Sequence, residues 1–240
     1  VTSRRPFCPQ NPKPQRATIL CEVIQRVSRA LPCLAVLALA GCDAKPPPQR
    51  EFALLEPPLA AHWQAAGIPG EGEVRIAEGV IRLAPGSPMT GARLAGDWEA
   101  LGLPWIDYAL TFEARRVEGQ DFFATCTFPV GSPERCVSLV IGGWGGGLVG
   151  ISSIDHFDAS QNSTRGEMRF ENGQWYRVRL EVRSDDLRVW INDAPMVNTS
   201  IKGRHLGLRA DDIDHCVPLG FASFLSVGEI RAIKLERLSR

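Results

Sequence analysis

The stretch Asp155–Asp158 gathers residue types that do chemistry. Both of its ends are carboxylates, His156 lies between them, and Asn162 follows shortly after. Carboxylates beside an imidazole can ligate a divalent cation such as Ca²⁺ or Zn²⁺, with Asp155 and Asp158 as the ligands. The two carboxylates and His156 could instead form a catalytic base with its orienting partner. A polar loop held by Asx turns, or one structural Ca²⁺, also explains the stretch.

A second run, Asp211–Cys216, is as dense in ligand types, but charged runs of this kind are usually solvated loops. The sequence contains neither HExxH nor GxSxG. It also lacks the Glu-x-Asp-x-(x)-Glu strand of jelly-roll glucanases, so a retaining mechanism with paired carboxylates is not expected. Gly145–Gly150 fits the dinucleotide pattern GxGxxG, but it opens a predicted strand rather than a helix, so no nucleotide cofactor is expected.

The segments that must position these residues alternate apolar and polar side chains, with almost no helical periodicity. The clearest is Trp175–Arg183, in which Tyr, Val, Leu and Val share one face of a strand and Arg and Glu share the other. This spacing predicts an all-β fold, an antiparallel two-sheet sandwich. The predicted strands are Glu73–Ile76, Val80–Ala84, Trp105–Ala114, Phe122–Phe128, Val137–Ile141, Leu148–Ser152, Trp175–Arg183, Leu187–Ile191, Leu219–Leu225 and Glu229–Leu238.

The N-terminal part of the chain is typical of export. Arg26 and Arg29 precede the apolar run Leu31–Ala40, which is too short to cross a bilayer. Leu39–Cys42 resembles the lipobox of bacterial lipoproteins, in which the cysteine becomes the lipidated N-terminus. We therefore expect Cys42 to anchor the protein to a lipid bilayer in the bacterial cell envelope, facing the periplasm or the exterior.

These features divide the chain into four segments. Residues 1–25 are interpreted as translated upstream sequence or a disordered stretch, and residues 26–41 as the lipoprotein signal peptide. Residues 42–50, with three consecutive prolines, form a stiff tether. Residues 51–240 form one β-sandwich domain, which is long enough to bury its own core.

The cysteines fit an exported domain. Residues Cys126 and Cys136 flank Gly131, and a turn centred on Gly131 would place the two sulfurs opposite each other on antiparallel strands. We therefore predict a disulfide, with two reduced buried thiols as the alternative. Cys216 could be a buried thiol, a metal ligand or an alternative disulfide partner.

The charge balance argues against some partners. Residues 1–41 hold six of the 27 basic residues and one of the 27 acidic residues, which leaves 21 basic and 26 acidic residues and a net charge of −5. A mildly acidic domain lacks the excess of basic residues that binds the phosphates of DNA or RNA, so no nucleic acid partner is expected. A monomer is expected.

The strands within Trp175–Trp190 and Glu229–Leu238 resemble the concanavalin A-like jelly rolls, and within those they look most like the 3-keto-disaccharide hydrolase domain family. The stretches Val140–Gly146, Gly150–Asp155 and Asp158–Asn162 also resemble a polar loop pattern in relatives of that family. The resemblance covers residues 52–238, and laminin-G-like binding domains share much of its strand pattern. It implies a jelly-roll sandwich that acts on an oxidised disaccharide, a glycoside whose C3 hydroxyl is already a ketone. Metal-assisted elimination at Asp155–Asp158 is the chemistry this would require.

Four residues are candidates for contact with a glycan. Trp144 lies between glycines, where its ring could stack on a sugar face or pack in the core. Asn162 belongs to the polar loop, and Arg177 and Trp190 lie on neighbouring predicted strands that are either a solvated back face or a sugar-binding face. The sequence thus supports a 3-keto-glycoside hydrolase or lyase, a carbohydrate-binding module without activity, or a module that binds protein partners.

Overall fold

Strand β11 (Tyr176–Val182) shows how the sequence builds the sheets. Tyr176, Val178, Leu180 and Val182 are buried, whereas the residues between them are exposed or half-buried. Its partners are β6 (Tyr108–Gly119) on one side and β12 (Asp186–Ile191) on the other, both antiparallel. Alternation of this kind gives each strand one face for the core and one for solvent.

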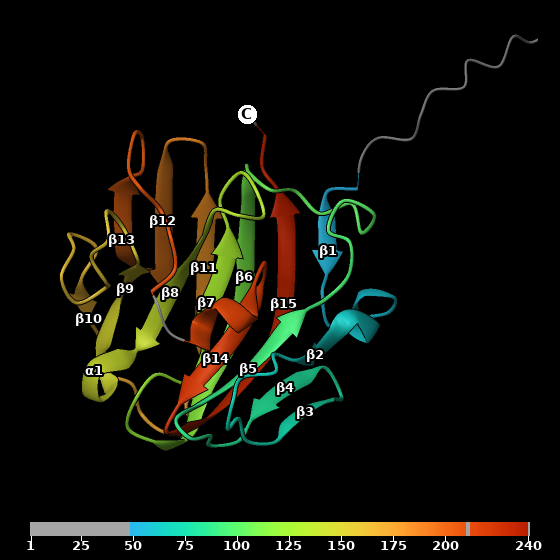
Figure 1. Cartoon of the computed structure of the whole chain (residues 1–240), viewed down its shortest axis with the longest axis vertical. Coiled ribbons are helices and arrows are strands. Elements are labelled where there is room, and N and C mark those ends of the chain that lie inside the picture. The colour runs from blue at the N-terminus through green and yellow to red at the C-terminus, as the bar shows by residue number, and fades with distance from the viewer. Residues whose placement is uncertain (1–48, 210–211, 240) are drawn as a thin grey trace, which may run out of the picture. The chain divides into compact units, whose positions relative to one another are not determined.

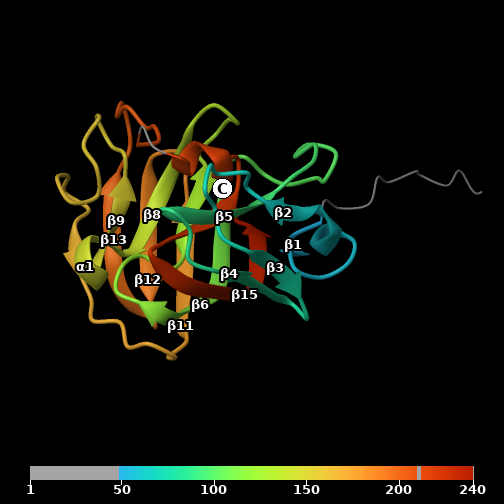
Figure 2. The ribbon, with the colours of Figure 1, turned by 60° about the horizontal axis from the view of Figure 1, so that its bottom comes forward.

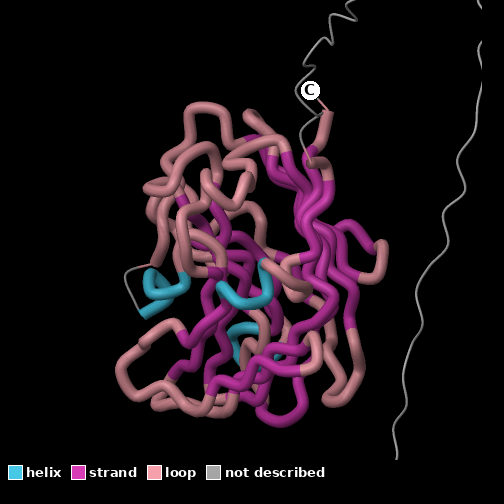
Figure 3. Tube along the Cα trace, turned by 90° about the vertical axis from the view of Figure 1, so that its right-hand side faces the viewer, coloured by secondary structure: helices cyan, strands magenta, loops and turns pink. Residues whose placement is uncertain are grey.

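The computed structural model describes residues 49–209 and 212–239, which belong to a compact unit of residues 47–240. Within these residues the strands form two antiparallel sheets that lie face to face as two layers (Figure 1, Figure 2). The side view in Figure 3 shows strands throughout and only short helical turns. The predicted all-β, two-sheet jelly-roll sandwich is confirmed.

The larger sheet has the order β13-β12-β11-β6-β15-β4-β3, with β1 added beside β15. Its remaining strands are β1 (Glu51–Ala53), β3 (Val74–Ala77), β4 (Val80–Leu83), β13 (Ala194–Ser200) and β15 (Ser226–Arg237).

The smaller sheet has the order β10-β9-β8-β7-β14-β5-β2. Its strands are β2 (Trp63–Ala65), β5 (Met89–Leu94), β7 (Thr125–Pro129), β8 (Cys136–Gly142), β9 (Leu148–Ser152), β10 (Gly166–Glu167) and β14 (Gly220–Phe224). The helical turns are η1 (Leu59–His62), α1 (Gly143–Gly146) and η2 (Asp212–Cys216).

The core lies between the two sheets. Phe112 of β6 meets Phe221 of β14 edge to face at 4.9 Å between ring centroids, and Trp63 stacks on Phe221 at 5.8 Å. The hydroxyl of Tyr108 donates a hydrogen bond of 2.6 Å to the carbonyl of Pro129, which joins β6 to β7 across the sandwich. Burial of these large rings holds the two layers together.

Several predicted strands are confirmed and others are shifted. The hairpin of β3 and β4 turns at Glu78 and Gly79, which both have positive φ, as a two-residue hairpin turn requires. The strand predicted at Trp105–Ala114 starts three residues later and runs on to Gly119. Strands β1, β2, β5, β10 and β13 have no counterpart among the predicted strands. Gly91 and Arg93 occupy outward positions of β5, which removes the alternation from its sequence.

The predicted disulfide between Cys126 and Cys136 is wrong: both cysteines are free. Cys136 pairs with Pro129 and Cys126 pairs with Leu139, so the hairpin is shifted by three residues from the predicted register. An odd shift puts the two side chains on opposite faces of the sheet. Cys216 is a free, buried thiol, which is one of the three states considered for it.

The signal peptide at 26–41, Cys42 and most of the tether lie outside the described residues. In the described part of the chain no helix is long and apolar enough to cross a membrane.

Candidate functional site

The outer face of the smaller sheet carries a group of hydroxyl side chains. Cys126 and Phe128 of β7 point into the core, so the alternating positions Thr125 and Thr127 point outward. Thr127 lies opposite Ser138 of β8, and Ser138 lies opposite Ser152 of β9. The strand register therefore gathers hydroxyls from three strands that are distant in sequence.

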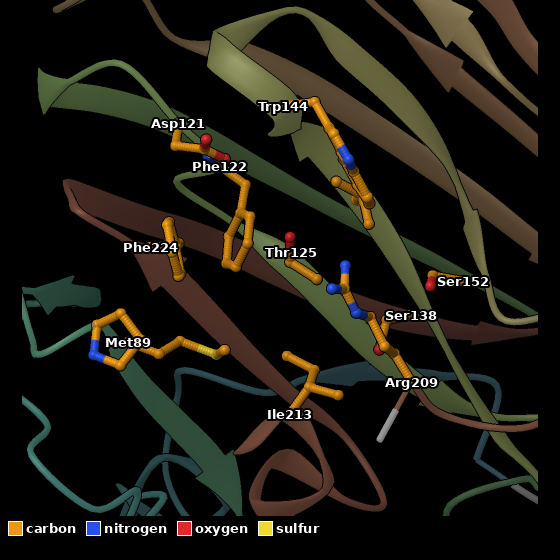
Figure 4. A pocket seen from close by; sticks show the side chains of 12 residues that line it. Met89, Asp121, Phe122, Thr125, Ser138, Trp144, Ser152, Arg209, Ile213 and Phe224 are labelled. Atoms are coloured by element: carbon orange, nitrogen blue, oxygen red, sulfur yellow. The ribbon is translucent and has the colours of Figure 1, made fainter. Parts of the chain in front are cut away.

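Thr125, Ser138 and Ser152 form the floor of a cavity of about 330 Å³. Figure 4 shows Phe122 and Phe224 on one side of it, Trp144 on the other, and Thr125 between them. The cavity is lined by Pro88, Met89, Asp121, Phe122, Thr125, Ser138, Val140, Trp144, Ser152, Arg209, Ile213 and Phe224. It combines aromatic walls with a polar floor.

Two of the floor hydroxyls lack partners. The Oγ1 of Thr125 and the Oγ of Ser152 are buried and have no hydrogen-bond partner among the described residues. By contrast, Thr127 Oγ1 and Ser138 Oγ lie 2.8 Å apart and bond to each other. A buried hydroxyl without a partner costs about 1–3 kcal/mol, so its persistence in a cavity points to a ligand that supplies the missing bonds.

Trp144 is presented to the cavity by a glycine-rich turn. Its φ is +48° and that of Gly145 is +87°, a left-handed turn in place of regular helix. Gly146 has φ +108°, and a Cβ there would lie 2.7 Å from the carbonyl oxygen of Gln120. Asp121 fixes the turn by accepting the Gly145 N–H at 3.2 Å. The indole is 47% exposed, so Trp144 is a surface residue and not a core tryptophan.

Arg209 connects the cavity to the predicted polar loop. Its guanidinium carbon lies 5.7 Å from the centroid of the Trp144 ring, and its Nη1 lies 3.8 Å from Asp158 Oδ2. The other oxygen of Asp158 accepts hydrogen bonds from the N–H and hydroxyl of Ser160 at 2.8 and 2.6 Å. Asp158 thus stands behind the cavity wall, where it caps a turn and positions Arg209.

Asp155 and His156 lie outside the lining of this cavity. Asp155 accepts the His205 N–H at 2.8 Å and pairs with Arg204 at 2.5 Å. These two contacts hold the pKa of the Asp155 carboxyl below its ordinary value, which makes it a weak base. The His156 ring stacks on that of His205 at 4.1 Å. Asp155 therefore joins its own loop to the loop that contains Arg204 and His205.

The Asn162 side chain makes its hydrogen bonds within the same loop and to the neighbouring strand β9. Its amide nitrogen donates to the carbonyls of Ile151, Phe157 and Asp158, and its oxygen accepts from the N–H and hydroxyl of Thr164. Because its N–H donors and its oxygen are all engaged, the Asn162 side chain stabilises the loop. Few of its hydrogen-bonding sites remain for a sugar.

Arg177 and Trp190 lie on the outer face of the larger sheet, the layer opposite Trp144. They line a separate hollow of about 270 Å³ with Arg179 and Asp193. Arg177 is ion-paired with Asp193. The structure thus separates these two residues from Trp144, because the outer faces of a sandwich point away from each other.

In the described part of the chain, the carboxylates predicted as metal ligands are engaged with other residues. Within residues 49–209 and 212–239 no cluster of three or more His, Cys, Asp or Glu side chains could hold an ion. Both predicted ligands, Asp155 and Asp158, are instead paired with arginines, whose charge opposes a cation nearby. From the second polar run, Ile213 lines the cavity and Cys216 is buried.

Most of the cavity residues were not among the sites predicted from the sequence. Thr125, Ser138, Ser152 and Phe224 lie in segments whose sequence predicts ordinary strands, and no motif marks Arg209. One signal was available: hydroxyl residues recur at the outward positions of strands whose inward positions are apolar. That pattern indicates a polar face on the sheet. It does not show that the surrounding loops turn this face into a cavity.

No protein-family model matches the sequence, and no curated protein matches it. In structure the chain is similar to the Crh5 transglycosylase in complex with NAG, with a TM-score of 0.53 and 7% identity over 80% of this chain and 86% of that chain. The apo Crh5 transglycosylase gives 0.50 and 8% over 79% and 84%. The carbohydrate binding module CBM66 from Bacillus subtilis gives 0.44 and 8% over 73% and 95%. At these identities the likeness shows the fold alone.

Proposed function

We propose that this protein binds carbohydrate in the cavity on the outer face of its smaller sheet. The observation that carries the proposal is the pair of unpartnered buried hydroxyls, Thr125 Oγ1 and Ser152 Oγ, at the floor of a cavity with aromatic walls. A sugar ring has hydroxyls at its edges and apolar C–H groups on its faces. It can therefore bond to the two floor hydroxyls and lie against Trp144 with one face.

The lining favours binding over hydrolysis. Asp121 is the one carboxylate among the described residues that line the cavity, and it is engaged with the N–H groups of Phe122 and Gly145. Acid–base cleavage of a glycoside requires two carboxyl groups on either side of the bond. Elimination from a 3-keto-glycoside requires a base near C2, and Asp155 and His156 do not line the cavity.

The floor hydroxyls allow a direct test. The substitution Thr125→Val removes the unpartnered hydroxyl and keeps the shape of the side chain. We expect glycan affinity to fall by roughly tenfold, since a hydrogen bond to the ligand is lost. We also expect the free energy of unfolding to rise by about 1 kcal/mol, because a buried polar atom without a partner is removed. Isothermal titration calorimetry and urea denaturation measure the two effects.

Thr127→Val is the matched control, since the same change two residues along β7 breaks the bond to Ser138 and should lower stability. The glycan itself comes from an array that includes a 3-keto-glucoside and its unoxidised parent. Retention without turnover supports a binding module. Cleavage of the keto form alone would replace the proposal with the hydrolase, and absence of any retention would reject it.

Anchoring through Cys42 and a place in the bacterial cell envelope are also part of the proposal. They rest on the basic flank, the short apolar run and the Leu39–Cys42 sequence. Expression in a bacterial host with the substitution Cys42→Ser should move the protein from the membrane fraction to the soluble fraction. An unchanged distribution would exclude the lipid anchor.

A further inference from the structure

The outer face of the larger sheet carries a row of arginines that its own carboxylates do not neutralise. Arg75 of β3 pairs across the hairpin with Arg82 of β4. Arg82 lies opposite Glu229 of β15, and Glu229 lies opposite Arg115 of β6. The row therefore places three guanidinium groups and one carboxylate side by side across four strands.

Glu229 forms ion pairs with two of these arginines, Arg82 and Arg115. It is 8% exposed, pairs with Arg82 through one oxygen and lies 2.6 Å from Arg115 through the other. The Arg75 side chain has no ion pair or hydrogen bond among the described residues. Like charges directly opposite on a sheet repel each other, so the hairpin carries an electrostatic cost that an anion placed between Arg75 and Arg82 would remove.

This row lies in a groove of about 400 Å³ on the outer face. The groove is lined by Arg75, Ala77, Glu78, Val80, Arg82, Arg115, Trp175, Glu229 and Arg231, that is, four arginines and two carboxylates. A third carboxylate, Glu113, pairs with Arg231 from the next strand at 2.7 Å. The groove keeps an excess of positive charge in an otherwise acidic domain.

Trp175 holds two of the guanidinium groups in place. The guanidinium carbon of Arg231 lies 3.9 Å from the centroid of the indole, and that of Arg115 lies 4.6 Å from it. Each guanidinium has five N–H donors, and the contacts to Glu229 and Glu113 use only some of them. Arginines fixed in this way lose little entropy when they bind a carboxylate.

We propose that this groove is a second binding site, for the carboxylates of a uronic acid polysaccharide. The anionic character of the ligand follows from the arginine row alone, whereas the choice of a polysaccharide rests on the proposed function. An anionic membrane fits less well: the exposed large apolar side chains of the described residues are Trp144, Phe157 and Leu225, and none of them lines the groove.

The test uses the full chain and oligomers of polygalacturonate in calorimetric titrations at low and high salt. We expect binding that weakens with salt and falls by about tenfold in Arg75→Glu, which removes one charge-assisted contact and introduces repulsion. Arg75→Glu should fold normally, because Arg75 is exposed and the new carboxylate would face Arg82. Arg165→Glu is the matched control, an exposed arginine paired with Glu167 beside β10, and should bind as the unchanged chain does.

Three results would overturn the inference: no binding by the unchanged chain, equal losses in Arg75→Glu and Arg165→Glu, or equal binding of poly-L-glutamate or anionic vesicles. Thr125→Val separates this site from the cavity on the other sheet. If Thr125→Val keeps full affinity for polygalacturonate, the two sites are independent, and failure of neutral glycan binding would then remove the proposed function alone. Loss of polygalacturonate binding in Thr125→Val would place that ligand in the cavity and reject the second site.

Discussion

Trp144→Ala should lower the affinity for the glycan selected on the array by roughly 30-fold, equivalent to about 2 kcal/mol, a loss typical of an aromatic residue at the centre of a binding site. The ring forms one wall of the cavity, opposite Phe122 and Phe224. Because nearly half of the indole is exposed, its removal leaves the core intact. Calorimetric titration measures the affinity, and circular dichroism measures the fold.

Phe157→Ala is the control for this experiment. Phe157 is an exposed aromatic residue, at 55%, that does not line the cavity. Its removal should leave the affinity unchanged. If both variants bind as the unchanged chain does, the sugar does not stack on Trp144. If both lose affinity equally, exposed aromatic surface in general is responsible, and the cavity is not the site.

Phe221→Ala should lower the free energy of unfolding by about 3–5 kcal/mol, the cost of removing a large buried ring and leaving a cavity. Phe221 is fully buried between the sheets and touches both Phe112 and Trp63. The melting temperature should fall by roughly 10 °C for a domain of this size. Urea denaturation and differential scanning calorimetry check the two values.

Phe224→Ala provides the comparison within the same strand. Phe224 lies three residues further along β14, on the outer face, and packs against Phe122 at 5.4 Å. Since its ring is only partly buried, we expect a loss of about 1 kcal/mol. The same substitution should nevertheless weaken glycan binding, because Phe224 lines the cavity. Equal losses of stability in the two variants would mean that β14 does not present opposite faces to the core and the cavity.

The local sequence predicts the structure correctly where a single strand or a single turn determines it. The alternation in Tyr176–Val182 predicts a strand with one buried face, and the pair Glu78 and Gly79 predicts a hairpin turn. Both depend on neighbouring residues alone, so the fold class followed from the sequence. The disulfide between Cys126 and Cys136 depended on the register of two strands. A small error in the centre of their turn moved the side chains to opposite faces.

The contacts of the polar loop also depend on residues that are distant in sequence. Asp155, His156 and Asp158 have the composition of a metal or catalytic site, but composition does not state which partners a side chain meets. Arg204, His205 and Arg209, distant in sequence, approach this loop in the fold and pair with its carboxylates. Residue type therefore identified the side chains of the loop, and the fold added the partners that engage them.

The all-β sandwich can be predicted from the sequence, because apolar alternation and turn residues act over a few positions. The tertiary structure, in contrast, sets where a ligand could bind. It brought Thr125, Ser138 and Ser152 together from three strands and set Trp144 across from Phe224. It also aligned Arg75, Arg82 and Arg115 on the opposite layer. The pairing of Arg75 with Arg82 follows from the local hairpin of β3 and β4, but Arg115 and the three hydroxyls join their groups through strand order and register, which are set by packing across the whole core.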